Sequence, residues 1–443
     1  MRASAPADSS VSAPSAPGIT AASGTASADA GDARPNYFYR SAHEVPVGNN
    51  FGVAYDLSIR FSLRERRLYR EDFDTPRELY NQLSYVRYGR KGQIGVPYIR
   101  LGVLDSSRLG YGQVLAYYDN TPQSAINPKR GLEAGMNLGF AGMELIAGDI
   151  TRLQVVGARV YGRPFASLGE SRVSHIQLGA TAATDFAPGA GYNGGALAAG
   201  ALVHSGSVND VVYARPTVFG ADITVPLLRD DTKEISTYAD LAQLKDGGHG
   251  GVLALQLYLP RVRHSSVLFK AEHRIVGDHY RPSYFDGYYE TERFQLGGSS
   301  SDALRSVNTR FATTLGAKSW GNAGYGEIRA ITPRLSMWTF YQRLYGDSKS
   351  GWAHVELDSR TIVPRVAAHV WYDKWSIQDG SDLFHFDARS RFQAALGARL
   401  YRHAHYLLVS RWEFVAERDY KGDAIRWIPQ RSTERRITFQ LPF

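Results

Sequence analysis

The sequence predicts an all-β fold: a transmembrane, antiparallel, up-and-down β-barrel of about 18 strands, with an even number between roughly 16 and 22. Three observations predict this fold class. Large apolar residues alternate with polar ones over stretches long enough to cross a bilayer. No run of about 18 apolar residues offers a membrane helix. The polar positions between the apolar ones carry many ionisable groups, which a dry core would not tolerate.

The stretch from Val53 to Leu63 is the clearest predicted strand. Its odd-numbered residues are all large and apolar, whereas the residues between them are small or polar. A transmembrane strand needs about 9–11 residues, so this stretch is long enough to cross a bilayer at the usual tilt. The same alternation recurs at residues 219–227, 253–259, 267–275, 353–357 and 392–400. We therefore expect one face of each strand to contact lipid and the other to line the interior.

The composition of the chain fits a barrel. The 443 residues include 27 Tyr and 44 Gly, which suit the aromatic belts and the turns of a barrel, and they include no Cys. The absence of Cys is compatible with the bacterial envelope without requiring it. The net charge is +8, but the basic residues alternate with apolar ones along the strands and do not form one patch. Nucleic-acid binding is therefore not expected, and anionic lipid headgroups or an anionic solute are the expected partners of this charge.

The interior face is predicted to be wet because it carries so many charges. No amphipathic helices are predicted that would cover a sheet with such a face, so a barrel with an aqueous lumen is favoured over a covered sheet. The residues expected to line the pore are Arg60, Arg87, Arg100, Asp222, Asp240, Lys270, Glu272, Arg274, Arg389, Arg391, Arg399, Arg411 and Glu413. With Arg436, the arginines near both ends of the chain are expected to form one positive arc.

Two pairs of these residues are expected to face each other across hairpins. Arg87 and Arg100 lie opposite each other if the turn between them is centred near residues 93–94, and their repulsion would draw in water or an anion. Asp222 and Asp240 lie nearly opposite across the turn at 229–233. Two carboxylates are too few to predict a calcium site, so no metal and no cofactor are expected.

Residues 1–45 consist mainly of Ala, Ser, Pro and Gly and are predicted to form a disordered periplasmic tail, and residues 46–443 are predicted to form the barrel. A secretory signal would place an apolar core of about 7–15 residues after Arg2, and this segment contains none. We expect that a signal peptide has been removed and that the mature protein lies in the outer membrane.

The end of the chain carries a specific pattern. Ile437, Phe439, Leu441 and Phe443 are apolar at alternate positions, with polar residues at 436, 438 and 440. This pattern resembles the C-terminal strand of Gram-negative outer-membrane β-barrel proteins, which ends on Phe and is presented to the barrel-assembly machinery. The resemblance implies a porin-like assembly class with that machinery as a partner, and it identifies no particular family.

An aromatic segment at 280–294 contains Tyr280, Tyr284, Phe285, Tyr288, Tyr289 and Phe294. Three interpretations are open: an aromatic girdle at the rim, which is favoured, a loop that folds into the lumen to narrow it, and a stacking surface for sugars. Separately, His354, Glu356, Asp358 and His369 share the wet face and are the best candidates for a catalytic group. Because lumen salt bridges are far commoner and no serine motif accompanies them, the chain is not expected to be an enzyme.

The lead functional hypothesis is a porin-like channel for passive passage of small hydrophilic, preferentially anionic solutes. One alternative is a closed barrel that acts as a receptor, adhesin or structural anchor through its extracellular loops. The other is an exporter of an anionic polysaccharide. Outer-membrane lipid, including lipopolysaccharide, is an expected partner in all three cases, and the pattern sets no oligomeric state.

Overall fold

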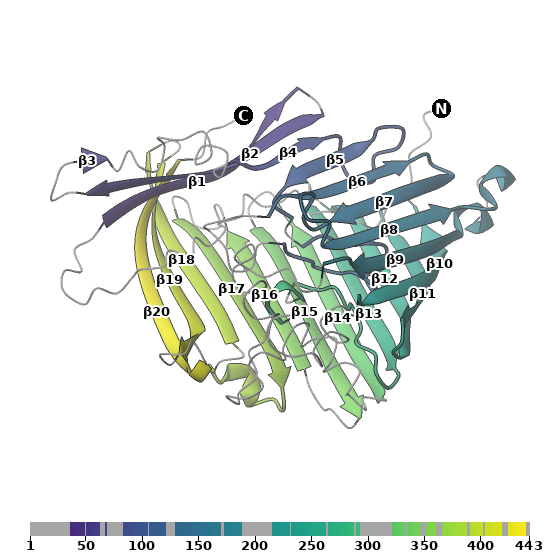
Figure 1. The fold of residues 1–443 in the computed structure, drawn as a ribbon. Coiled ribbons are helices and arrows are strands. Elements are labelled where there is room, and N and C mark those ends of the chain that lie inside the picture. Colours follow the sequence, from purple (N-terminus) through teal and green to yellow (C-terminus); the bar gives the residue numbers. More distant parts are fainter. Residues whose placement is uncertain are drawn as a thin grey trace.

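The alternating stretches form one large sheet in the computed structural model of the chain (Figure 1). The structure describes residues 36–48, 50–62, 67–68, 83–104, 106–120, 129–169, 172–187, 215–230, 232–262, 265–287, 289–292, 321–332, 335–346, 351–359, 366–387, 390–401, 404–418 and 424–439. Within these residues the sheet has 20 strands, a number inside the predicted range. Strands that follow each other along the chain pair antiparallel, so the predicted all-β, up-and-down fold is confirmed.

The strands are β1 (Asn36–Val47), β2 (Phe51–Ser62), β3 (Arg67–Leu68), β4 (Leu83–Tyr88), β5 (Tyr98–Gly102), β6 (Gly131–Asn137), β7 (Ala141–Ala147), β8 (Val155–Gly162), β9 (Gln177–Asp185), β10 (Thr217–Arg229), β11 (Glu234–Leu244), β12 (His249–Val262), β13 (Ser265–Val276), β14 (Gly321–Ile331), β15 (Leu335–Gly346), β16 (Gly351–Ser359), β17 (Val366–Ile377), β18 (Ser390–Tyr401), β19 (Ala404–Arg418) and β20 (Ala424–Phe439). Short helical turns occur at α4 (Tyr289–Glu292), η2 (Ala166–Leu168), η3 (Arg172–His175) and η4 (Asp382–Phe384). The described helices are too short and too polar to cross a membrane.

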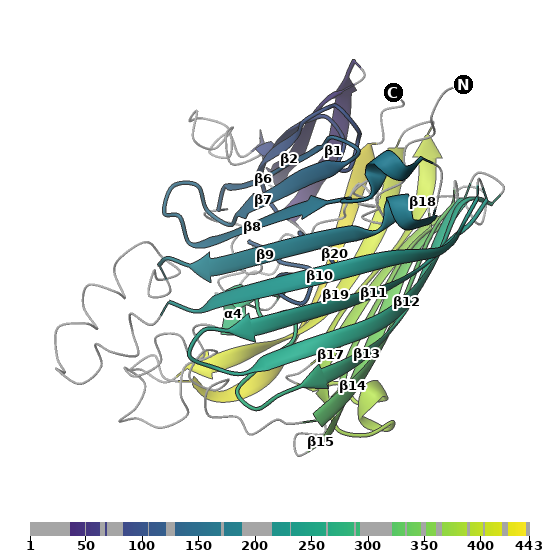
Figure 2. The ribbon, with the colours of Figure 1, turned by 90° about the vertical axis from the view of Figure 1, so that its right-hand side faces the viewer.

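The sheet curls into a barrel-like shape whose two ends meet at a short seam (Figure 2). β1 runs along β2 from one end to the other, so the sheet begins at Asn36, within the segment that the sequence assigns to the tail. β1 also contacts β20 in parallel through two residue pairs, Phe38–Arg436 and Tyr39–Ile437. An even number of up-and-down strands would bring the first and last strands together antiparallel. The contact is parallel because β3 pairs only with the last two residues of β2, next to β4, so that 19 of the 20 strands follow one another around the described wall.

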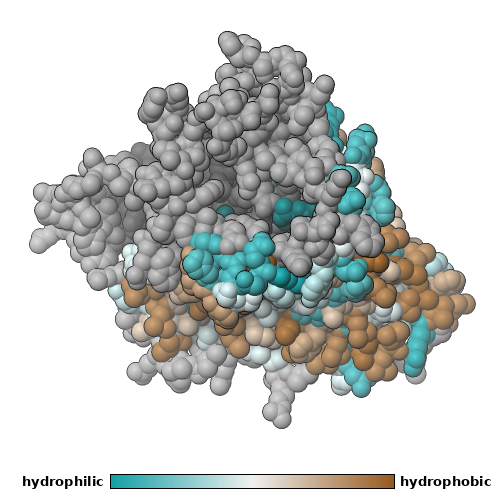
Figure 3. Space-filling model, turned by 90° about the horizontal axis from the view of Figure 1, so that it is seen from below, coloured by the Kyte–Doolittle hydropathy of each residue, from teal (hydrophilic) through white to brown (hydrophobic). Residues whose placement is uncertain are grey.

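The two faces of the wall differ as the alternation predicts. Outward residues such as Leu241, Leu253 and Leu396 are about three-fifths exposed, and apolar side chains form a broad band over the described outer wall in Figure 3. Inward residues such as Asp222 and Glu272 are buried. Because the charged face is buried and the apolar face is exposed, the wall has the polarity of a membrane barrel.

The two rims carry connections of different length. Short connections join β10 to β11, β12 to β13 and β18 to β19 on one rim. The other rim carries long connections, among them residues 186–216 between β9 and β10, residues 103–130 between β5 and β6 and residues 277–320 between β13 and β14. The last two contribute to the interior of the sheet.

Candidate functional site: a plugged lumen

Two segments from the long connections fold inward and pair with each other, and we call them together the plug (residues 106–120 and 278–290, of which the structure describes all but 288). The backbone N–H of Ala116 donates to the carbonyl of Phe285 at 3.1 Å, and the N–H of Phe285 donates to Val114 at 3.2 Å. The N–H of Ser283 donates to Gln113 at 2.9 Å. Figure 2 shows α4, at the end of the second segment, inside the curl of the sheet.

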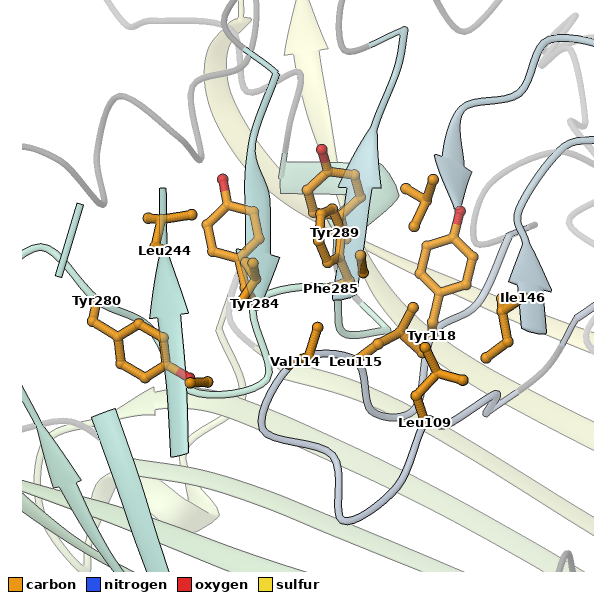
Figure 4. Close-up of a cluster of buried hydrophobic side chains, with 14 of the residues drawn as sticks. Leu109, Val114, Leu115, Tyr118, Ile146, Leu244, Tyr280, Tyr284, Phe285 and Tyr289 are labelled. Atoms are coloured by element: carbon orange, nitrogen blue, oxygen red, sulfur yellow. The ribbon is translucent and has the colours of Figure 1, made fainter. Parts of the chain in front are cut away.

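An apolar core holds the plug against the wall (Figure 4). The plug contributes Leu109, Val114, Leu115, Tyr118, Tyr280, Tyr284, Phe285 and Tyr289, and the wall contributes Ile146, Val155, Ala183, Val218, Ala242, Leu244, Val276 and Ala323. The four aromatic residues from the 280–294 segment are at most 2% exposed, so the favoured prediction of a rim girdle is wrong for them. The alternative of an inward-folding loop holds instead. Tyr288 and Phe294 lie outside the described residues.

Polar groups of the plug donate hydrogen bonds to carboxylates of the wall. The Tyr117 hydroxyl donates to Glu327 at 3.0 Å and lies 2.6 Å from the Tyr325 hydroxyl. Tyr289 donates to Asp185 at 2.7 Å, and the Gly110 N–H donates to Glu144 at 3.0 Å. Burial, together with the negative charge of Glu327, raises the pKa of Tyr117 to about 12, so this hydroxyl remains a donor at neutral pH.

The plug backbone is strained in places. Six non-glycine residues in the described part of the chain have a positive φ, and four of them, Ser106, Tyr117, His279 and Ser283, lie in the plug. Such a conformation costs on the order of 1–3 kcal/mol per residue and persists only where the surroundings enforce it. The apolar core and the carboxylate contacts are those surroundings.

Three predicted pore-lining residues of β13 form a buried ion-pair chain. Lys270 lies 2.7 Å from Glu272 and 3.5 Å from Glu327 of β14, and Arg274 lies 2.5 Å from Glu272. Arg329 continues the chain at 2.5 Å from Glu327. Each of these five side chains is ion-paired with a neighbour, so this part of the interior face is paired and not freely wet.

Asp222 of the Asp222–Asp240 pair forms an ion pair with an arginine. The two aspartates are direct register partners between β10 and β11, as the sequence predicts. Arg159 of β8 donates to both oxygens of Asp222, at 2.7 and 3.1 Å, and lies 3.9 Å from Glu144. The guanidinium therefore pairs with Asp222, whereas Asp240 accepts from the backbone N–H of Gln113 at 3.4 Å. Hairpin register could not point to Arg159, because Arg159 and Asp222 are 63 residues apart along the chain.

Arg87 and Arg100 are also direct register partners, between β4 and β5, as predicted. On its other side Arg100 is paired with Glu133 of β6, and its guanidinium lies 4.0 Å from the centre of the Tyr85 ring. Glu133 lies 2.7 Å from Lys91. A carboxylate and an aromatic ring thus accompany Arg100, and the water or anion expected between Arg87 and Arg100 stays a prediction.

The arginines near the C-terminus belong to β18–β20. The register pairs Arg391 with Asp373, Arg399 with His405, Arg411 with Gln393, Glu413 with Gln430 and Arg436 with Leu407, and in β2 it pairs Arg60 with Phe38. Arg391 is half-buried; Arg389 and the side chains of the other five lie outside what the structure describes. Of the predicted assembly signal, Ile437 and Phe439 are in β20, and Leu441 and Phe443 lie outside the described residues. The pore-lining and assembly roles stay predictions.

The histidine group is a buried ion-pair cluster. His354 Nδ1 lies 2.8 Å from Asp373, and Nε2 lies 3.9 Å from Glu356. The His354 ring is also 4.3 Å from the Trp338 ring, while His369 pairs with Asp358 in register. Carboxylates and aromatic rings surround His354, an arrangement that fits a structural role.

No family model matches this chain, and no curated protein matches it. Among solved structures, the FrpB iron transporter from Neisseria meningitidis (F3-3 variant) aligns with 90% of this chain and 72% of its own length, at 11% identity and a TM-score of 0.31. Similarity at this level shows neither a shared fold nor a shared function.

Proposed function

We propose that the chain forms an outer-membrane channel for small hydrophilic, preferentially anionic solutes, narrowed by the plug. One observation carries the proposal: the described plug contacts extend from the β4–β5 connection to β16, a part of the wall whose interior face carries buried ion pairs. The passage would then run on the opposite side, along β18–β20 and β2. No enzymatic step is part of this proposal, and the His354 cluster has a structural role in it.

The anionic preference follows from the residues on that opposite side. Arg391, Arg399, Arg411 and Arg436 lie on β18–β20 and Arg60 lies on β2. The carboxylates of the same strands are Glu413, Glu417, Glu434 and Asp56. Arginine stays charged at any working pH. A narrow lumen with low-dielectric walls concentrates such a potential on passing ions.

A closed barrel is the second candidate, and the plug itself favours it. An apolar core and several charge-assisted hydrogen bonds fix the plug, so the protein could display loops without conducting ions. Export of an anionic polysaccharide would use the same arginine-bearing strands as the channel. Conductance separates the channel from the closed barrel.

The test is a planar-bilayer recording with a salt gradient. The wild type is expected to show open-channel current steps and an anion-selective reversal potential. This anion selectivity should weaken as the Debye length falls from about 30 Å at 0.01 M to about 3 Å at 1 M salt. Arg391→Glu combined with Arg411→Glu should shift selectivity toward cations. Lys233→Glu makes the same kind of charge change in an exposed turn and should leave it unchanged. Cation selectivity in the wild type contradicts the proposal, and the absence of conductance favours the closed barrel.

A further inference from the structure

The connection between β17 and β18 folds back over the outside of the wall, and we call residues 378–387 the outer flap (the short coil after β17 in Figure 1). The Tyr372 hydroxyl donates to the carbonyl of Leu383 in the flap at 2.6 Å. The Phe386 ring lies 5.7 Å from the Tyr372 ring and 5.9 Å from the Phe392 ring. Tyr372 and Phe392 are register partners and share a face with exposed Leu396, so the flap covers the outer face.

A lysine on the outer face explains why the flap folds this way. Lys374 lies two positions after Tyr372 and therefore points outward, yet its side chain is fully buried. Its Nζ lies 2.8 Å from Asp387 and 3.4 Å from Asp382, and it donates to the carbonyl of His385 at 2.7 Å. A lone ammonium group on an apolar wall would be costly, and the flap supplies its counter-charges.

A second cation of the outer face ties down the start of the flap. Arg343 of β15 donates from Nη1 to the carbonyl of Ile377 at 2.8 Å and from Nη2 to that of Gln378 at 2.5 Å. The flap is thus fixed at both ends by polar groups that it shields. Phe384 of the flap is 80% exposed, and Phe386, which packs against Tyr372 and Phe392, is still 49% exposed.

We propose that the outer flap is a membrane anchor, in which Phe384 and Phe386 insert into the lipid interface beside the barrel. This inference rests on the proposed membrane location. The occupant is lipid because the two rings continue the exposed apolar surface of Leu396 and Leu408, and because they lie at a rim, where aromatic side chains favour the interface. The aspartates beneath them face Lys374 and not the lipid.

The chain contains no cysteine, so single labelling sites can be introduced freely. We would attach a nitroxide at Phe384→Cys in lipid vesicles and compare its accessibility to oxygen, which concentrates in lipid, with that to a water-soluble nickel complex. Two controls are Leu396→Cys on the outer wall and Gly380→Cys in the same flap, where an added Cβ meets no atom within 4 Å. The oxygen-to-nickel ratio at 384 should exceed that at 380 several-fold and stay below that at 396, which lies nearer the middle of its strand.

The outcomes separate the anchor from the membrane proposal. If the oxygen-to-nickel ratio at 384 is typical of water while that at 396 is typical of lipid, the anchor alone is overturned. If the ratios at both sites are typical of water, the membrane location is overturned. A label at 384 that is inaccessible to both relaxants and broadened by a second label indicates contact with a second copy of the chain and also overturns the anchor. Adding Lys374→Gln should release the flap and lower the oxygen-to-nickel ratio at 384 to a value typical of water. An unchanged ratio in this variant contradicts the role of Lys374.

Discussion

Replacing Phe285 with alanine tests whether the plug is a packed unit. The ring is fully buried, with the rings of Tyr284 and Tyr289 at 5.1 and 4.8 Å, while the pairing with Val114 and Ala116 uses only backbone atoms. The substitution therefore removes packing and keeps the hydrogen bonds. Truncating a buried phenylalanine costs about 3–5 kcal/mol, which lowers the ratio of docked to released plug roughly 10²- to 10⁴-fold.

Hydrogen exchange measures this loss directly. The amides of Ala116 and Phe285 are bonded across the two segments, so their exchange should accelerate by that factor while amides of β12 and β13 stay protected. Phe384→Ala is the matched control, because its ring is exposed and its loss should leave the plug amides unchanged. Equal protection of the plug amides in wild type and Phe285→Ala would refute the packed plug. Acceleration throughout the wall would show that plug and barrel open as one unit.

Four further predictions concern the wall, the plug and assembly. Arg159→Ala leaves a buried carboxylate without its partner and should destabilise the protein by about 3–5 kcal/mol in a refolding titration. Leu253→Arg should cost about 2–4 kcal/mol if it lies near mid-bilayer, whereas Thr232→Arg in an exposed turn should change stability by less than about 0.5 kcal/mol. Because the pKa of Tyr117 is raised to about 12, its contribution to plug stability is complete below pH ~10 and is lost as pH rises toward 12. The open-state current should show this alkaline step, and Tyr117→Phe should abolish it. Deleting Phe443 should lower the yield in outer membranes while refolding in detergent persists, and equal yields would argue against an assembly signal.

The wall could be predicted from the sequence because alternation fixes both the strands and their faces. A one-residue slip would move every apolar side chain to the wrong face, so register follows from pattern and turn length. The pairs Arg87–Arg100 and Asp222–Asp240 show this, since both were placed opposite each other from their hairpins alone. Partners from strands distant in sequence, such as Arg159, could not be found in this way.

The sequence predicted the inward fold of 280–294 only as an alternative and did not predict the plug segment 106–120, because the plug contacts join residues far apart in the chain. The wall nevertheless shows where a plug is needed. On the inner face of β11 the charged Asp240 is followed by Ala242 and Leu244, and on β13 Arg274 is followed by Val276. The face that should be wet becomes apolar toward the rim that carries the long connections. Apolar side chains on the inner face must be shielded from water by other apolar side chains, and the aromatic residues of 280–294 were the obvious candidates to shield them.

The outer flap follows the same rule on the opposite face. Lys374 interrupts the apolar positions of β17 and therefore marks a place where the outer wall needs cover, just as Leu244 does on the inner wall. In both cases a residue of the wrong polarity for its face is covered by a connection from the same rim. Many charges on a face do not by themselves imply water, because pairing beneath a cover is the other way to accommodate them. If ions pass, the current should therefore depend on the arginines of β18–β20 and not on Lys270, Glu272 or Arg274, which are ion-paired under the plug.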